Sequence, residues 1–182
     1  EHHHVSVAFR TLFLPEFFFL ENVTRECIQE MRQVWTKMVL ATDMSLHSRF
    51  LSKWKSRLHG ERLEFSSRED VTLLLQIAMK CADISNLTKP WHLNIMWVER
   101  LTEEFYRQGD RERELKMAIS PMCDRSQPTL AKGQKAFIDF VVRPLFQSFV
   151  DMFPNAKIMV DTMIENRRRW DELDRQQHRV AT

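Results

Sequence analysis

The sequence predicts an all-α protein, and three observations point to this class. Only three Gly and six Pro occur among 182 residues, whereas thirteen Phe, ten Met and five Trp supply material for a core. No segment alternates apolar and polar residues strongly enough to predict a strand. Apolar residues instead recur at the three- and four-residue spacing of helices. We therefore expect one compact domain over residues 1–182, with roughly seven to nine helices.

Composition narrows the kinds of binding partner and the cellular compartment that we expect. The formal net charge is +2 and both signs are mixed along the chain, so there is no general case for binding nucleic acid. Cys27, Cys81 and Cys123 are scattered and lack CxxC spacing, which argues against a disulfide framework and a structural zinc site. A reducing, cytoplasmic setting is the expectation. No signal peptide and no transmembrane run is recognised.

The stretch from Leu73 to Leu87 (LLLQIAMKCADISNL) has the spacing of a helix buried along one stripe, and it ends in polar residues. If the helix continues through both, Asp83 and Asn86 lie on one face, because side chains three residues apart stack one turn above another. A carboxylate at such a deep position needs a partner, since an unpaired buried charge is costly. The residues leave two partners open for Asp83: a metal ion, or Lys80 one turn back.

Capping and breaking residues divide the chain into further helices. Thr24 is expected to cap one helix, and Ser66 or Ser67 to cap the central one, because these side chains accept from free backbone N–H groups. Pro90 is expected to start a helix, since its fixed φ suits the first turn. Gly109 is expected to end that helix.

Three features of the remaining chain keep alternatives open. Pro144 should kink a helix or cap its continuation, before a last amphipathic helix from 158 to 170. Three consecutive arginines at 167–169 form a solvated face or an intersubunit patch, which leaves a homodimer open. Asp43 and His47 are four residues apart and could pair on a solvated helix face.

Several segments resemble the class I cyclic-nucleotide phosphodiesterases. KCADISN at 80–86 resembles the CADxSN segment of that family, and TEEFYRQGDRERE at 102–114 is similar to its cAMP-specific type-four and protozoan members. Other matching segments follow in the family's order: EHHHVSVAF at 1–9, ATDMS at 41–45, SPMCD at 120–124 and QKAFIDF at 134–140. The resemblance runs from Glu1 to about Trp170. It implies a helical phosphodiesterase catalytic domain.

The resemblance implies a reaction and a metal site. The expected reaction is hydrolysis of a 3',5'-cyclic nucleotide, with cAMP preferred, to the 5'-monophosphate. Two divalent ions, zinc and magnesium or manganese, are expected to activate water and neutralise the phosphate oxygens. Asp83 corresponds to a direct metal ligand of the family. Glu1 and Thr42 correspond to residues that hold water on the metals, although Glu1 could also be part of a solvated terminus.

The substrate pocket is expected around Gln134 and Phe137, which share a helix face at a spacing of three. An amide both donates and accepts, so Gln134 can match a purine edge, and an aromatic ring one turn away can stack on the base. The resemblance adds seven pocket residues: Met44, Asn86, Trp97, Val98, Leu101, Phe105 and Met122. From spacing alone, the stripe of Trp97, Leu101 and Phe105 would be ordinary core.

The sequence departs from the family pattern in two ways. The acidic His and the HxxxH and HD ligands of the family precede the position of Glu1, so the chain is expected to be the C-terminal part of the domain and inactive alone. Asn94 stands where type-four enzymes have a Tyr that braces the glutamine. Since the orientation of the Gln134 amide decides base choice, a dual-specificity or cGMP-selective enzyme is one alternative. A non-catalytic helical interaction module is the other.

Overall fold

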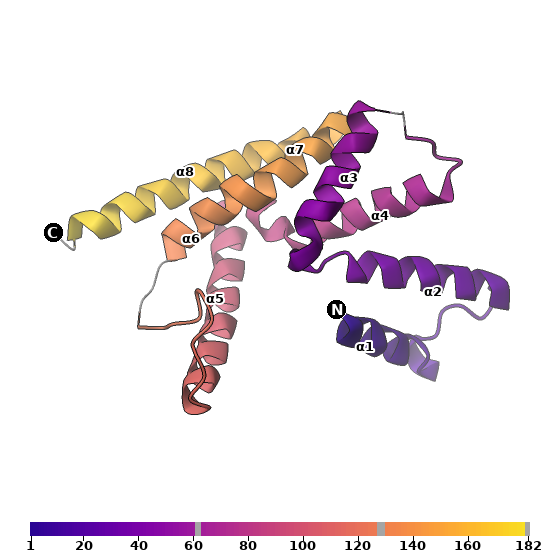
Figure 1. Cartoon of the computed structure of the whole chain (residues 1–182), viewed down its shortest axis with the longest axis horizontal. Helices are drawn as coiled ribbons and strands as arrows, with labels where there is room; N and C mark the ends of the chain where they lie inside the picture. The colour runs from indigo at the N-terminus through magenta and orange to yellow at the C-terminus, as the bar shows by residue number, and fades with distance from the viewer. Residues whose placement is uncertain (61–62, 127–129, 181–182) are drawn as a thin grey trace. The chain divides into compact units, whose positions relative to one another are not determined.

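The computed structural model describes residues 1–60, 63–126 and 130–180, and these ranges are all-helical (Figure 1). Their α-helices are α1 (His2–Leu12), α2 (Arg25–Leu40), α3 (His47–His59), α4 (Arg68–Asp83), α5 (Trp91–Glu114), α6 (Leu130–Phe137), α7 (Arg143–Met152) and α8 (Lys157–Val180). Short 3-10 or π segments join them: η1 (Pro15–Phe17), η2 (Met44–Leu46), η3 (Ser85–Thr88), η4 (Ile138–Val142) and η5 (Pro154–Ala156). The all-α prediction and the expected number of helices are confirmed for the described ranges.

The chain divides into two compact units, Glu1–Asp83 (unit 1) and Ile84–Thr182 (unit 2). In unit 1, α2 contacts both α1 and α4, and α3 contacts α4. Phe9 of α1 stacks on Trp35 of α2 with 6.2 Å between ring centroids. Leu73 and Ile77 are buried along α4, as the apolar stripe of the sequence predicted.

Two capping predictions in unit 1 are confirmed. Thr24 Oγ1 accepts a hydrogen bond from the backbone N–H of Cys27 at 3.3 Å, and Ser67 Oγ accepts from Asp70 N at 3.4 Å. Asp70 does more than complement the helix dipole, because its carboxylate is buried. It pairs with Arg57 Nε at 3.2 Å and accepts from Glu64 N at 3.1 Å. These contacts tie the start of α4 to α3.

In unit 2, α6 and α7 pack along α8 (Figure 1). Pro144 lies in the first turn of α7, directly after the π segment η4, so the predicted disturbance of the helix is confirmed. Proline has no N–H to donate and its ring crowds the preceding turn, which accounts for the widened backbone there. The core consists of fully buried apolar side chains: Val98, Ile138, Val142, Leu145, Phe146 and Met163.

A buried polar network also holds unit 2 together. Asn94 donates to the backbone carbonyl of Asn86 at 3.0 Å and accepts from Trp170 Nε1 at 3.1 Å. Asn166 donates to the carbonyls of Leu87 and Lys89 at 2.9 and 2.8 Å. Both amides are at most 1% exposed, so these bonds replace their lost hydration. The network fixes η3 against α5 and α8.

Three predicted helix boundaries are wrong, and one of them is the end of the last helix, which continues past position 170 to Val180. α4 ends at Asp83, and Ile84 leaves the helical region at φ −103° and ψ 22°, so Asp83 and Asn86 do not share one helix. Ser and Asn at the next two positions favour turns over helix interiors, because their side chains compete for backbone groups. α5 passes through Gly109 and ends at Glu114. Gly109 does not end the helix; it lets the backbone of Cys123 approach α5 closely.

None of the helices in the described ranges combines the length and the apolar character needed to cross a membrane.

Candidate functional site

Asp83 is the last residue of α4, and its side chain is exposed. The expectation of a deeply buried carboxylate is therefore wrong: the final turn of α4 buries Lys80 and Cys81 but leaves Asp83 exposed. Neighbouring protein still raises the pKa of Asp83 by desolvation, against the attraction of Lys80. A carboxylate at the negative end of a helix dipole is also unfavourable by itself. Both effects favour a cation next to Asp83.

Lys80 is occupied by another partner. Its side chain is buried, and Nζ donates to the backbone carbonyl of Ala41 at 2.9 Å. Nζ also lies 5.9 Å from the ring centroid of Phe50. Burial lowers the pKa of Lys80. Lys80 thus bonds the end of α2, and it forms no ion pair with Asp83 in the part of the chain that the structure describes.

The other predicted residues of unit 1 are distributed over three elements. Glu1 is exposed ahead of α1. Thr42 follows α2, and its hydroxyl donates to the carbonyl of Val39 at 2.8 Å, which leaves the oxygen able to accept. Met44 begins η2 and is 43% exposed. Among the described residues, no three His, Cys, Asp or Glu side chains form a group that could hold a metal.

The alternative of an Asp43–His47 pair is wrong. The Asp43 carboxylate caps η2 by accepting from Ser45 N at 2.8 Å, which lowers the pKa of Asp43. His47 is buried, and neither ring nitrogen has a hydrogen-bond partner among the described residues. Burial lowers the pKa of His47, so its neutral form is favoured.

Unit 2 brings four of the predicted pocket residues to one small cavity. Gln134 comes from α6, Leu101 and Phe105 from α5, and Met122 from the loop that follows α5. The cavity measures about 40 Å³, so a purine would rest at its mouth. Leu101, Phe105 and Met122 contribute apolar walls, and Gln134 adds an amide. Such a combination suits a flat ring with hydrogen-bonding groups along one edge.

Four other predicted pocket residues do not line this cavity. Trp97 is 53% exposed on α5, with the Arg100 guanidinium 5.8 Å from its ring centroid. Val98 is fully buried in the core and has no surface to offer a ligand. Phe137 is half-buried at the end of α6, and Asn86 is half-buried in η3.

The Gln134 side chain forms no hydrogen bond with the described residues, whereas the helix that carries it is held firmly. Lys135 Nζ pairs with Asp171 at 3.1 Å and also with Asp174, both on α8, and these bonds raise the pKa of Lys135. Asn94 cannot brace the glutamine, because both ends of its amide are used in the buried network. The backbone of Gln134 is thus held in place, while no described hydrogen bond fixes which way its amide is turned.

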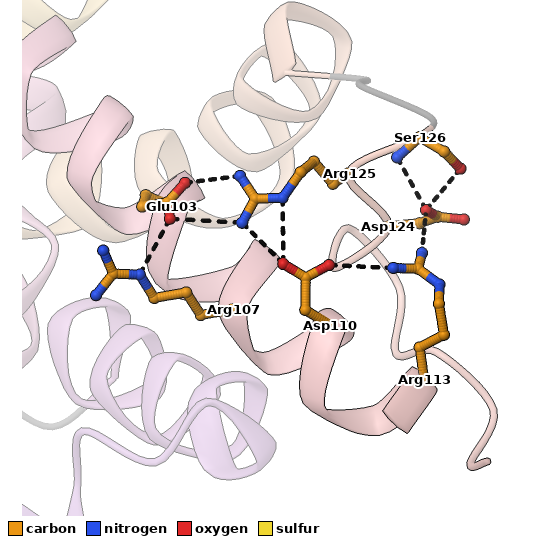
Figure 2. A network of polar contacts seen from close by, with 7 residues as sticks. All are labelled: Glu103, Arg107, Asp110, Arg113, Asp124, Arg125 and Ser126. Carbon is orange, nitrogen blue, oxygen red and sulfur yellow. Dashed lines mark hydrogen bonds and ion pairs between the residues drawn. The ribbon is translucent and has the colours of Figure 1, made fainter. Parts of the chain in front are cut away.

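The loop that follows α5, residues 115–126, is called the Met122 loop. An ion-pair network, which we call the Arg125 clamp, holds this loop on α5 (Figure 2). Arg125 contacts Glu103 at 2.8 Å and Asp110 at 2.9 Å. Arg113 bridges Asp110 at 3.1 Å to Asp124 at 3.0 Å. Hydrogen bonds from Arg125 and then from Arg107 lower the pKa of Glu103 to about 2. The carboxylate of Glu103 therefore stays charged at ordinary pH, and the clamp persists.

The same loop is strained and closely packed where it meets α5. Met122 has a positive φ of 67°, a conformation that costs a side-chain-bearing residue roughly 1–2 kcal/mol. A Cβ at Gly109 would lie 1.9 Å from the carbonyl oxygen of Cys123. Sequence reasoning missed these roles, because Arg125 and Glu103 are 22 residues apart and belong to no shared motif.

Replacing Arg125 by Ala is expected to loosen the loop while α5 stays folded. Exposed ion pairs contribute little to global stability, so the change should be local. Amide hydrogen exchange in residues 117–126 should accelerate about tenfold. Arg107→Ala is the matched control, because Arg107 contacts Glu103 at 3.0 Å without reaching the loop. Equal exchange in the two variants would mean that the clamp does not hold the loop.

Comparisons with known proteins identify the family of this chain. Residues 1–163 match the family described as 3'5'-cyclic nucleotide phosphodiesterase. Probable 3',5'-cyclic-AMP phosphodiesterase pde-4 of Caenorhabditis elegans is 39% identical over 174 residues, which is 92% of this chain and 26% of the relative. High affinity cGMP-specific 3',5'-cyclic phosphodiesterase 9A of Homo sapiens is 36% identical over 176 residues, covering 96% and 29%.

A solved structure of LmjPDEB1 in complex with IBMX matches with a TM-score of 0.88 and 36% identity, covering 94% of this chain and 52% of that chain. The chain belongs to the 3'5'-cyclic nucleotide phosphodiesterase family, as the resemblance predicted. It spans about a quarter of the length of these curated relatives and about half of the solved chain.

Proposed function

We propose that this chain contributes to the hydrolysis of 3',5'-cyclic nucleotides to 5'-monophosphates. The observation that carries the proposal is the cavity of unit 2, where Gln134 meets the apolar side chains of Leu101, Phe105 and Met122. Family membership supports the class of substrate, since the matched relatives are named for cyclic nucleotides.

In this proposal, unit 2 recognises the base. The Gln134 amide donates one hydrogen bond to the purine edge and accepts another. Leu101 and Phe105 exclude water from these bonds, which strengthens them. Phe137 lies one turn from Gln134 and outside the lining of the cavity, so in this proposal it would stack on the part of the base that protrudes from the mouth.

We propose cAMP as the preferred substrate, and a cGMP-hydrolysing or dual-specificity enzyme as the second candidate. The segment TEEFYRQGDRERE, the half-buried Asn86 and the relative named for cyclic AMP favour the first. The lack of a described partner for the Gln134 amide favours the second, because an amide that turns freely can present its donor or its acceptor to either base. The relative named as cGMP-specific is nearly as similar.

Unit 1 contributes to the metal site in this proposal. Asp83 would be one ligand of two divalent ions, zinc and magnesium or manganese. When bound, these ions would activate a water and neutralise the phosphate oxygens. Asp83 suits a cation because of its position at the C-terminal end of α4 and its desolvation. Glu1 and Thr42 would accept hydrogen bonds from water near the metals. The described residues form no group of three metal-binding side chains by themselves.

Gln134→Ala in the full-length protein tests base recognition. Losing a paired amide typically costs about 1 to 3 kcal/mol, so KM for cAMP should rise roughly five- to 150-fold and the preference between cAMP and cGMP should shrink. The measurement is kcat and KM for both nucleotides. Gln147→Ala is the control, because Gln147 is an exposed glutamine of α7 that bonds only Asp151 in the described structure. Unchanged KM and unchanged preference in Gln134→Ala would contradict the assignment.

A further inference from the structure

A hollow of about 810 Å³ lies between α2, α3 and α4, entirely within unit 1. It is lined by four basic side chains and one acidic one: Lys37 of α2, Arg49 and Lys53 of α3, and Arg68 and Glu69 of α4. We call it the basic groove. Its volume falls in the range of about 300–1,000 Å³ that is usual for ligand-binding pockets. Asp83 does not line the basic groove, and the groove is separate from the cavity of unit 2 that Gln134 lines.

The cations of the basic groove are poorly compensated. Arg68 contacts Glu30 at 3.5 Å, and both side chains are exposed. Lys37, Arg49 and Lys53 form no ion pair within the described residues. The cations of the Arg125 clamp, by contrast, each pair closely with carboxylates. Uncompensated like charges around a hollow repel one another and create a positive potential, which an anionic ligand relieves.

The shape of the basic groove indicates an extended ligand. Leu46, Arg49, Phe50 and Lys53 recur at the spacing of one helix stripe, so they face the hollow together. Leu46 and Phe50 are half-buried and supply apolar surface, whereas the cations are exposed around it. The four cations come from three helices, so one compact anion cannot reach them all. A concave surface of this kind also fits a peptide better than a flat lipid layer.

We propose that the basic groove binds a short acidic peptide segment of a partner protein. Carboxylates of the segment would pair with Lys37, Arg49, Lys53 and Arg68, and an apolar side chain between them would lie on Leu46 and Phe50. Glu69 is the one carboxylate lining the groove, and it disfavours the segment locally. This inference is independent of the proposed function.

The test is fluorescence anisotropy with the whole chain and a labelled peptide, Glu-Glu-Phe-Glu-Asp-Glu. We expect saturable binding that weakens as the salt concentration rises. Lys53→Glu should weaken binding about tenfold, because it replaces an attraction by a repulsion. Lys55→Glu is the matched control: it makes the same charge change on the same helix, two residues away and off the groove stripe. Glu69→Lys should strengthen binding.

Circular dichroism shows whether each variant keeps its helices, and Lys53→Gln replaces Lys53→Glu if the latter unfolds. Equal weakening by Lys53→Glu and Lys55→Glu would overturn the proposal, because only net charge would matter. No saturable binding by the wild-type chain would overturn it as well. So would binding of inorganic phosphate or of phosphatidylserine vesicles at the groove while the peptide stays free.

Discussion

Asp83→Ala is expected to abolish hydrolysis of cyclic nucleotides by the full-length protein and to lower its metal content. Under the proposed function, Asp83 is the one direct ligand provided by the described residues. Loss of a metal that contributes about 4 kcal/mol of charge stabilisation reduces the rate about a thousandfold. The carboxylate must be ionised to bind a cation, and desolvation raises its pKa. Metal affinity should therefore fall as the pH decreases toward that pKa.

Metal content and the rate of hydrolysis together show whether Asp83 is a metal ligand or only a structural residue. Metal content by inductively coupled plasma mass spectrometry should fall in Asp83→Ala and also in Asp83→Asn, which keeps the shape but not the charge. Glu21→Ala is the control, because Glu21 is an exposed acid of unit 1 ahead of α2. Full metal occupancy with an unchanged rate would show that Asp83 serves only the local electrostatics around Lys80.

Gly109→Ala is expected to displace the Met122 loop and to destabilise unit 2. The new Cβ would lie 1.9 Å from the Cys123 carbonyl oxygen and 2.7 Å from its carbon. These are backbone atoms and cannot rotate away, so either the loop or α5 must shift. We expect a loss of about 3 kcal/mol, the upper end of the usual cost of overpacking. The Arg125 clamp should be strained in the same variant, because Asp110 is the next residue of α5.

Thermal unfolding followed by circular dichroism measures the loss, and Gly133→Ala provides the comparison. Gly133 also lies in a helix near the Met122 loop, but a Cβ there would meet only Met122 Sδ at 3.9 Å, an ordinary contact. The added methyl group should stabilise α6 by up to about 1 kcal/mol, since Ala favours helix over Gly. If both variants unfold at the wild-type temperature, the close approach at Gly109 is not required.

Local spacing predicted most of the helices, because each helix buries a stripe that repeats along the sequence. Leu73 and Ile77 on α4 follow that rule, and Thr24 and Ser67 cap their helices as expected. Gly109 was misread because a glycine inside a helical pattern looks like an end. A glycine is needed there because Cys123, fourteen positions later, packs its backbone against this point of α5, and no local pattern reveals that contact.

The candidate site was predictable only in part. Helical spacing placed Leu101 and Phe105 on one face, and family resemblance singled out Gln134 and Met122. All four line the cavity of unit 2. The exposure of Asp83 could not be predicted from spacing, because Lys80 and Cys81 in the same last turn of α4 are buried. The full burial of Val98 depends on the neighbouring helices and not on its own segment.

The network of Asn94, Asn166 and Trp170 restricts how unit 2 can diverge. Asn94 satisfies the indole of Trp170 and a carbonyl of η3 at once, across 76 positions of sequence. Exchanging either side chain alone would leave a buried donor or acceptor unsatisfied, at a cost of about 1–3 kcal/mol. Substitutions at Asn94 and Trp170 should therefore be tolerated mainly in pairs, and chimeras that join halves of distant homologues between α5 and α8 should fail more often than those joined elsewhere in unit 2.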